Sequence, residues 1–180
     1  MRALFQWGWV PAFAGMTMVA GAATPAHADQ LWLGFYDHDA TFADEKFESG
    51  QDIKAGWIGE PIEALSAIGR PAPHVLLSAA LDGGTDYAAV GLNWKFGGTL
   101  YFRPGIGLSV NNGPDRAFSN GNRVDLGSKV TFEPEAAVGW RVSDRVAVEA
   151  SWVHLSHATL FSKQNRGIDS LGVRLLFTLP

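Results

Sequence analysis

The chain has 180 residues and a formal net charge of −4; 47% of its residues are hydrophobic, 18% are charged and none is cysteine. This length suits one domain, and the absence of cysteine excludes disulfides and thiolate metal sites. A slightly acidic chain without a basic run is not expected to bind nucleic acid, and no residue pattern predicts a metal ion or an organic cofactor.

The N-terminal segment predicts export. Residues 12–23 are small and apolar, and Ala26-His27-Ala28 has the A-x-A form of a cleavage site before Asp29. We therefore expect residues 1–28 to be a signal peptide and residues 29–180 to form a single folded domain. From Asp29 onward, no segment reaches the roughly 20 consecutive apolar residues of a membrane helix.

Turn signals divide residues 29–180 into eight candidate strands, joined in three places by short hairpin turns. The expected strands are residues 30–37, 51–59, 72–81, 86–96, 99–110, 128–142, 145–157 and 167–179. Residues 61–69 are expected to form one helical turn, because Ile62, Leu65 and Ile68 share a helical face. The segment 111–127 is a long linker rich in Asn, Gly and Asp.

Apolar and small or polar residues alternate along these strands, and the charges fall on the faces opposite the aromatic ones. These charged residues are Arg103, Glu133, Glu135, Arg141, Glu149 and Arg174. A soluble β-sandwich with ordinary core aromatics also alternates, but paired charges inside a narrow barrel account better for this pattern. The predicted fold is all-β, an eight-stranded antiparallel transmembrane β-barrel of the outer-membrane type. Pro104 and Pro134 lie in mid-strand, where bulges are expected.

Strand direction predicts which end of the barrel faces the cell. If both chain ends are periplasmic, an aromatic row lies at the periplasmic interface. Its members are Trp94, Phe96, Phe102, Trp140 and Phe177. The linker 111–127 is then extracellular, where Arg116 and Arg123 would be available to lipid phosphates; a solvated loop without a ligand is the alternative.

The pair His154 and Ser156 is the strongest functional signal. Residues two apart on a strand share a face, and here that face continues the outward row of the barrel. A symmetric connection to the next strand places Asp169 opposite His154 on the same face. A base, a hydroxyl and a carboxylate together are the parts of an activated serine. The alternative is that three polar residues simply lie at headgroup level.

The other histidines carry less functional information. His157 lies on the face opposite His154, so joint metal binding by the two is not expected. His38 is expected in a surface loop, and His74 in the lumen or a turn.

Four motifs carry a family resemblance. They are Phe132-Glu133-Pro134-Glu135 with Val138-Gly139-Trp140-Arg141, His154-Leu155-Ser156, Asn165-Arg166-Gly167-Ile168-Asp169, and Leu171-Gly172-Val173-Arg174. Together they resemble the outer-membrane lipid A 3-O-deacylases of the PagL type, often labelled acyloxyacyl hydrolase. The resemblance is strongest from Val130 to the C-terminus.

The resemblance implies a barrel in the outer membrane that removes the ester-linked 3-hydroxyacyl chain of lipid A at the extracellular leaflet. It implies Ser156 as nucleophile, His154 as base and Asp169 as acid, without a cofactor. His157 stands where the family often has an oxyanion-hole Asn, and Asn165 is a second oxyanion or substrate candidate. The expected partners are lipopolysaccharide and membrane lipid, with a homodimer left open.

Two other functions stay open at this point. One is a catalytically inactive barrel with a structural or adhesive role; the other is a small transport barrel, against which the charged, closed lumen argues.

Overall fold

The computed structural model describes residues 29–40, 48–114, 123–161, 163 and 165–180; the predicted signal peptide lies outside them. The strands are β1 (Gln30–Asp37), β2 (Gln51–Ile58), β3 (Ala72–Ala80), β4 (Tyr87–Asn93), β5 (Phe96–Gly97), β6 (Leu100–Asn111), β7 (Val130–Arg141), β8 (Val146–Leu155) and β9 (Ile168–Thr178). A 3-10 helix, η1 (Glu63–Ile68), separates β2 from β3, as the sequence predicts. No helix in the described residues is long and apolar enough to cross a membrane.

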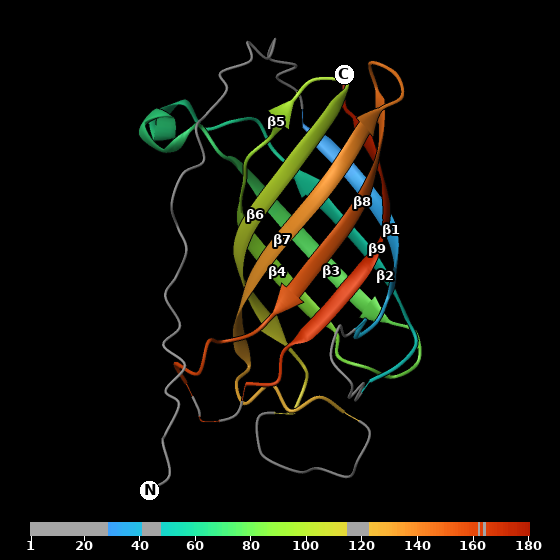
Figure 1. Cartoon of the computed structure of the whole chain (residues 1–180), viewed down its shortest axis with the longest axis vertical. Coiled ribbons are helices and arrows are strands. Elements are labelled where there is room, and N and C mark those ends of the chain that lie inside the picture. The colour runs from blue at the N-terminus through green and yellow to red at the C-terminus, as the bar shows by residue number, and fades with distance from the viewer. Residues whose placement is uncertain (1–28, 41–47, 115–122, 162, 164) are drawn as a thin grey trace, which may run out of the picture.

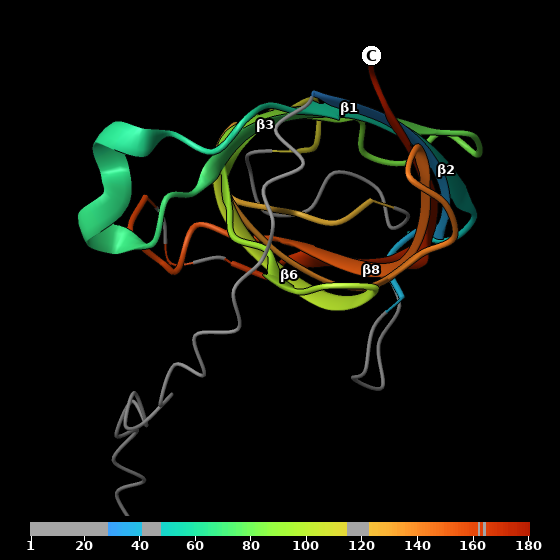
Figure 2. The ribbon, with the colours of Figure 1, turned by 90° about the horizontal axis from the view of Figure 1, so that it is seen from above.

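The strands form one closed antiparallel sheet (Figures 1 and 2). Its order is β4-β3-β2-β1-β9-β8-β7-β6-β5, and pairing of β4 with β6 closes it. The short β5 continues the register of β4 along β6, so the barrel has eight full strands. This arrangement confirms the predicted fold class.

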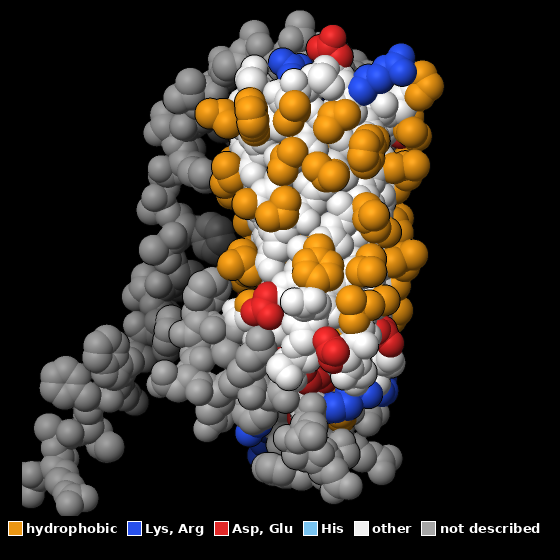
Figure 3. All heavy atoms as spheres, turned by 90° about the vertical axis from the view of Figure 1, so that its right-hand side faces the viewer, with side chains coloured by type: hydrophobic (Ala, Val, Ile, Leu, Met, Phe, Trp, Pro, Cys, Tyr) orange, Lys and Arg blue, Asp and Glu red, His pale blue; other side chains and the backbone are white. Residues whose placement is uncertain are grey.

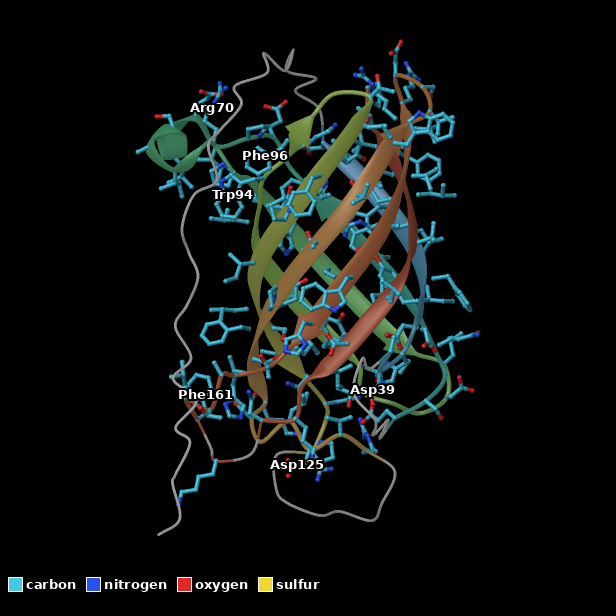
Figure 4. The ribbon with its side chains drawn as sticks, in the orientation of Figure 1. Asp39, Arg70, Trp94, Phe96, Asp125 and Phe161 are labelled. Carbon is cyan, nitrogen blue, oxygen red and sulfur yellow. The ribbon has the colours of Figure 1, made fainter. Side chains whose placement is uncertain are left out.

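The two ends of the barrel carry different connections. At one end, the terminal end, the first strand begins at Gln30 and the last strand finishes at Thr178. The same end carries the turns between β2 and β3, β4 and β6, and β7 and β8. The loop end carries the described residues of the connections 38–50, 81–86, 112–129 and 156–167. Trp94 and Phe96 lie at the terminal end, whereas Asp39 and Asp125 lie at the loop end (Figure 4).

The outer wall is apolar and the interior is polar. Exposed outward residues include Leu33, Phe35, Leu77, Val90, Leu108, Val138, Trp140, Val173 and Phe177. On the face shown in Figure 3, hydrophobic side chains spread over the wall and charges gather towards its ends. This inside-out distribution is what a barrel immersed in lipid requires.

Buried ion pairs fill the barrel. Arg174 donates from Nε to Glu149 at 2.6 Å and from Nη1 to Glu135 at 2.9 Å. Arg103 donates from Nε to the second oxygen of Glu149 at 2.9 Å. Removing one member of such a network leaves an uncompensated buried charge, which costs about 3–5 kcal/mol. Five of the six charges predicted on inward faces are buried; Arg141 is not, because it ends β7 at the barrel mouth.

The two mid-strand prolines do not make bulges. Pro104 and Pro134 sit within an unbroken β6–β7 register, paired with Ala136 and Ile106. Pro104 faces the break between β4 and β5, where the backbone N–H of Trp94 donates to its carbonyl at 2.9 Å. Proline has no N–H with which to return that bond, so the strand predicted over 86–96 is interrupted after Asn93. The Trp94 indole donates to the carbonyl of Ile68 in η1 at 2.7 Å.

His38 is a buried residue, not a surface-loop residue as expected. Its Nδ1 contacts Asp52 and its Nε2 contacts Glu48, each at 2.6 Å. Burial favours the neutral ring, but the hydrogen bonds and charges of the two carboxylates outweigh it and raise the pKa of His38 to about 9. His74 lies inside the barrel, where its ring contacts Glu133. The lumen was one of the two positions expected for His74.

Glu48 links three connections at the loop end by hydrogen bonds. It accepts hydrogen bonds from the backbone N–H groups of Thr85 and Val124, at 2.6 and 2.8 Å. Val124 and Leu126 are themselves completely buried. Arg123, expected to be available to lipid phosphates, donates instead to the carbonyl of Gly84 and to Asn112. Arg116 lies outside the described residues.

The lipid-facing wall gives a stability prediction. Val173→Arg places a charge at the middle of β9 and should lower the free energy of unfolding in lipid vesicles by about 2–4 kcal/mol. Leu81→Arg, in an exposed turn, should cost at most about 1 kcal/mol. Urea unfolding followed by tryptophan fluorescence measures both. Equal, small effects would indicate a wall that faces water.

Candidate active site

The register of β8 and β9 brings together two of the predicted site residues. His154 stands directly opposite Asp169, as the symmetric connection predicted. Both side chains lie on the outer face near the loop end, and they are 25% and 23% exposed. The site is therefore half-buried on the wall of the barrel and does not open into its lumen.

A hydrogen bond orients the imidazole. Nδ1 of His154 lies 2.9 Å from Oδ1 of Asp169. Because an ionised carboxylate only accepts hydrogen bonds, the neutral ring in this contact carries its proton on Nδ1 and a lone pair on Nε2. A neutral histidine held this way can accept a proton at Nε2.

Ser156 lies two residues beyond His154 on the same side of the chain. It forms an isolated bridge with Phe132, with backbone N–O distances of 2.7 and 3.2 Å. Among the described residues, its hydroxyl makes no hydrogen bond, with His154 or otherwise. The hydroxyl of Ser156 is therefore not committed to a structural bond.

Pro134 loosens the sheet beside the site. The Phe132–Ser156 bridge continues the β7–β8 register, which places Pro134 opposite His154. Without an N–H, Pro134 cannot donate to the carbonyl of His154. The regular β7–β8 ladder consequently stops at Glu135 and Val153, one residue before the candidate base.

Gly167 packs against the histidine ring. A Cβ at this position would lie 2.7 Å from Cε1 and 3.2 Å from Nε2 of His154, and its φ of +74° suits glycine. The glycine therefore makes room for the imidazole and sets the position of its Nε2 edge.

Asn165 and His157 meet across the β8–β9 connection. The backbone N–H of His157 donates to Oδ1 of Asn165 at 2.8 Å. The His157 ring is completely buried, and its Nδ1 accepts from the backbone N–H of Phe161 at 3.4 Å. Phe161 lies outside the barrel wall at the loop end (Figure 4).

Among the described residues, no cluster of three or more potential metal ligands occurs.

Trp152 is a site residue that the sequence reasoning missed. Its indole N–H donates to Oδ1 of Asp169 at 2.8 Å, and its ring stacks on His154 with centroids 5.8 Å apart. Period-two alternation along β8 puts Trp152 on the same outward face as His154, and this is the signal in the sequence that could have found it.

The family comparison covers most of the barrel. A family model described as lipid A 3-O-deacylase (PagL) matches residues 69–178. No curated protein sequence gives a significant match.

Solved structures share the fold. A crystal structure of the outer membrane enzyme PagL is 18% identical, with a TM-score of 0.61, over 83% of this chain and 99% of that one. The N-terminal β-barrel domain of Pseudomonas aeruginosa OprF is 10% identical, with a TM-score of 0.53, over 84% and 98%. A de novo designed transmembrane β-barrel is 9% identical, with a TM-score of 0.52, over 87% and 98%. At these identities, the likeness concerns the fold alone.

The packing of Gly167 on His154 can be tested through the reactivity of Ser156. Gly167→Ala should displace the imidazole and slow labelling of Ser156 by a fluorophosphonate about 10- to 100-fold. Gly83→Ala is the matched control, because Gly83 also has a positive φ, +81°, but no atom lies within 4 Å of its added Cβ. Equal labelling rates in the two variants would show that contact with the ring is unimportant.

Proposed function

The chain belongs to the lipid A 3-O-deacylase (PagL) family, and we propose that Ser156, His154 and Asp169 form the catalytic triad of this outer-membrane hydrolase. The observation that carries the proposal is the 2.9 Å contact between His154 Nδ1 and Asp169 Oδ1 on the lipid-facing wall. This contact leaves Nε2 of His154 to act as the base. Ser156 follows two residues later on the same face of the strand.

The reaction proceeds through an acyl-enzyme. Ser156 Oγ attacks the carbonyl carbon of the 3-position ester while His154 Nε2 accepts the hydroxyl proton. The tetrahedral intermediate collapses, the sugar oxygen leaves, and His154 delivers the proton to it. Water then attacks the acyl-serine with His154 again as base, which releases the 3-hydroxy fatty acid and restores Ser156. Asp169 stabilises the imidazolium in both halves.

The location of the site determines how substrate arrives. Because the triad faces outward from the wall, the ester approaches sideways from the bilayer, not through the lumen. Outer-membrane barrels have short periplasmic turns and longer extracellular loops. The loop end, with the triad, is accordingly extracellular, at the leaflet that holds lipopolysaccharide. Residues 1–28 act as the signal peptide that directs the chain there.

Asn165 is the oxyanion donor in this proposal. The backbone N–H of His157 occupies its Oδ1, so the amide nitrogen Nδ2 is left to donate to the developing oxyanion. The His157 side chain is a weaker candidate, because its ring is buried and its Nδ1 already accepts a backbone N–H. His157 thus contributes mainly by orienting Asn165.

The serine mechanism predicts that Ser156→Ala abolishes deacylation. Mass spectrometry of lipid A from a Gram-negative host expressing the protein measures loss of the 3-hydroxyacyl chain. Ser151→Ala is the control, because Ser151 lies on β8, the strand that carries His154, but is buried on its inward face, away from the triad. Both variants should retain a heat-modifiable folded barrel. Full activity of Ser156→Ala would favour another nucleophile, and an inactive wild type would favour the structural or adhesive barrel.

The oxyanion assignment predicts unequal effects at neighbouring positions. Asn165→Ala should lower kcat about 10²- to 10³-fold with little change in KM. His157→Phe removes the side-chain donor, keeps the backbone N–H that binds Asn165, and should lower kcat much less. Initial rates of fatty-acid release in detergent micelles measure both. A larger loss in His157→Phe than in Asn165→Ala would assign the oxyanion role to His157.

A further inference from the structure

Trp152 and His154 share a single acceptor atom. Oδ1 of Asp169 accepts from the indole Nε1 of Trp152 at 2.8 Å and lies 2.9 Å from His154 Nδ1. The two rings are nearly parallel, with an angle of 20° between their planes. Trp152 is opposite Leu171 in the register and so reaches Asp169 diagonally along the same face.

An indole N–H is a donor only. The atom that faces Trp152 must therefore be an oxygen, and that same oxygen faces His154. A nitrogen of the imidazole that meets this oxygen must carry a proton. Trp152 thus acts on His154 through the atom that Asp169 presents to both rings.

We propose that Trp152 is a positioning residue that selects the tautomer of His154, with the proton on Nδ1, by holding an oxygen of residue 169 towards the imidazole. This inference rests on the proposed triad and goes beyond it, since it assigns a role to a residue that does not touch the reacting atoms.

In the wild type, the carboxylate of Asp169 can keep the proton on Nδ1 of His154 even without Trp152. Both oxygens of an ionised aspartate are acceptors, so either can face His154 when the indole N–H is removed. Trp152→Phe keeps a smaller aromatic ring beside His154 and removes the N–H donor, and Trp140→Phe makes the same change of ring elsewhere on the wall. We therefore expect a loss in kcat of less than about tenfold, because only the orientation of the carboxylate is relaxed.

The effect of Trp152 on the His154 tautomer should be largest when residue 169 carries an amide in place of the carboxylate. The side chain introduced by Asp169→Asn has one oxygen and one NH₂ group, and the indole N–H of Trp152 can donate only to the oxygen. With Trp152 present, the amide oxygen stays towards Nδ1 and the useful tautomer survives. Without Trp152, the NH₂ group can turn to Nδ1 and force the proton onto Nε2. In a serine protease, the wrong tautomer from this acid-to-amide change costs about 10⁴ in kcat.

A double-mutant cycle tests the proposal. The four proteins are the wild type, Trp152→Phe, Asp169→Asn and the double variant, assayed for kcat and KM on lipid A in detergent micelles. The fold-loss from Trp152→Phe should be at least about tenfold larger in the Asp169→Asn background than in the wild type, and it should appear in kcat. Equal fold-losses in both backgrounds, or a smaller loss in the Asp169→Asn background, would overturn the proposal.

Ring ¹⁵N chemical shifts of His154 provide a second readout that does not need activity. Asp169→Asn should keep the Nδ1–H tautomer, and the double variant should shift towards Nε2–H. If Asp169→Asn has no measurable turnover, these shifts alone decide. The same tautomer in both variants would refute the role of Trp152.

Two controls separate this inference from its premises. Trp140→Phe removes another indole from the outer wall, near the end of β7 and opposite Leu100 and Val148; a loss equal to that of Trp152→Phe would mean a general membrane-anchoring effect. Ser156→Ala tests the triad itself. An active Ser156→Ala overturns the proposed function, whereas an inactive one with an additive cycle overturns only the role of Trp152.

Discussion

The buried ion pairs of Arg174 with Glu135 and Glu149 are the interaction on which the rest of this structure depends. They occupy the interior of a narrow barrel, and their charges would be very costly on the lipid side. Because side chains alternate along a strand, fixing these residues inward also fixes their neighbours outward. The position of His154 and Ser156 on the wall follows from the inward position of Glu149 on the same strand.

This constraint bears on where a lipid hydrolase of this fold can meet its substrate. The interior is filled by paired charges, so it leaves no room for a substrate with long acyl chains. The wall, by contrast, is already in contact with membrane lipid. In the proposed mechanism, His154 and Asp169 near the loop end meet the ester from the lipid side of this wall.

Local irregularities in the sheet shape the site. Pro134 ends the regular β7–β8 ladder beside His154, and Gly167 leaves space for the imidazole. Trp152 adds a second donor to the carboxylate of Asp169. All three features lie beside the imidazole of His154, and the proposed general-base role of its Nε2 requires a fixed ring orientation.

The sequence by itself determined the eight strands apart from the break after Asn93, five of the six inward charges, and the pairing of His154 with Asp169. Period-two alternation and short connections are local properties of the chain, and these features follow from them. Only the tertiary structure decided that His38 is buried between Glu48 and Asp52, and that Arg123 is engaged by Gly84 and Asn112. It also decided that Trp152 reaches Asp169 and that His157 contacts Asn165. These contacts join loops and side-chain ends whose positions depend on how distant segments close over one another, and no alternation along a single strand encodes that closure.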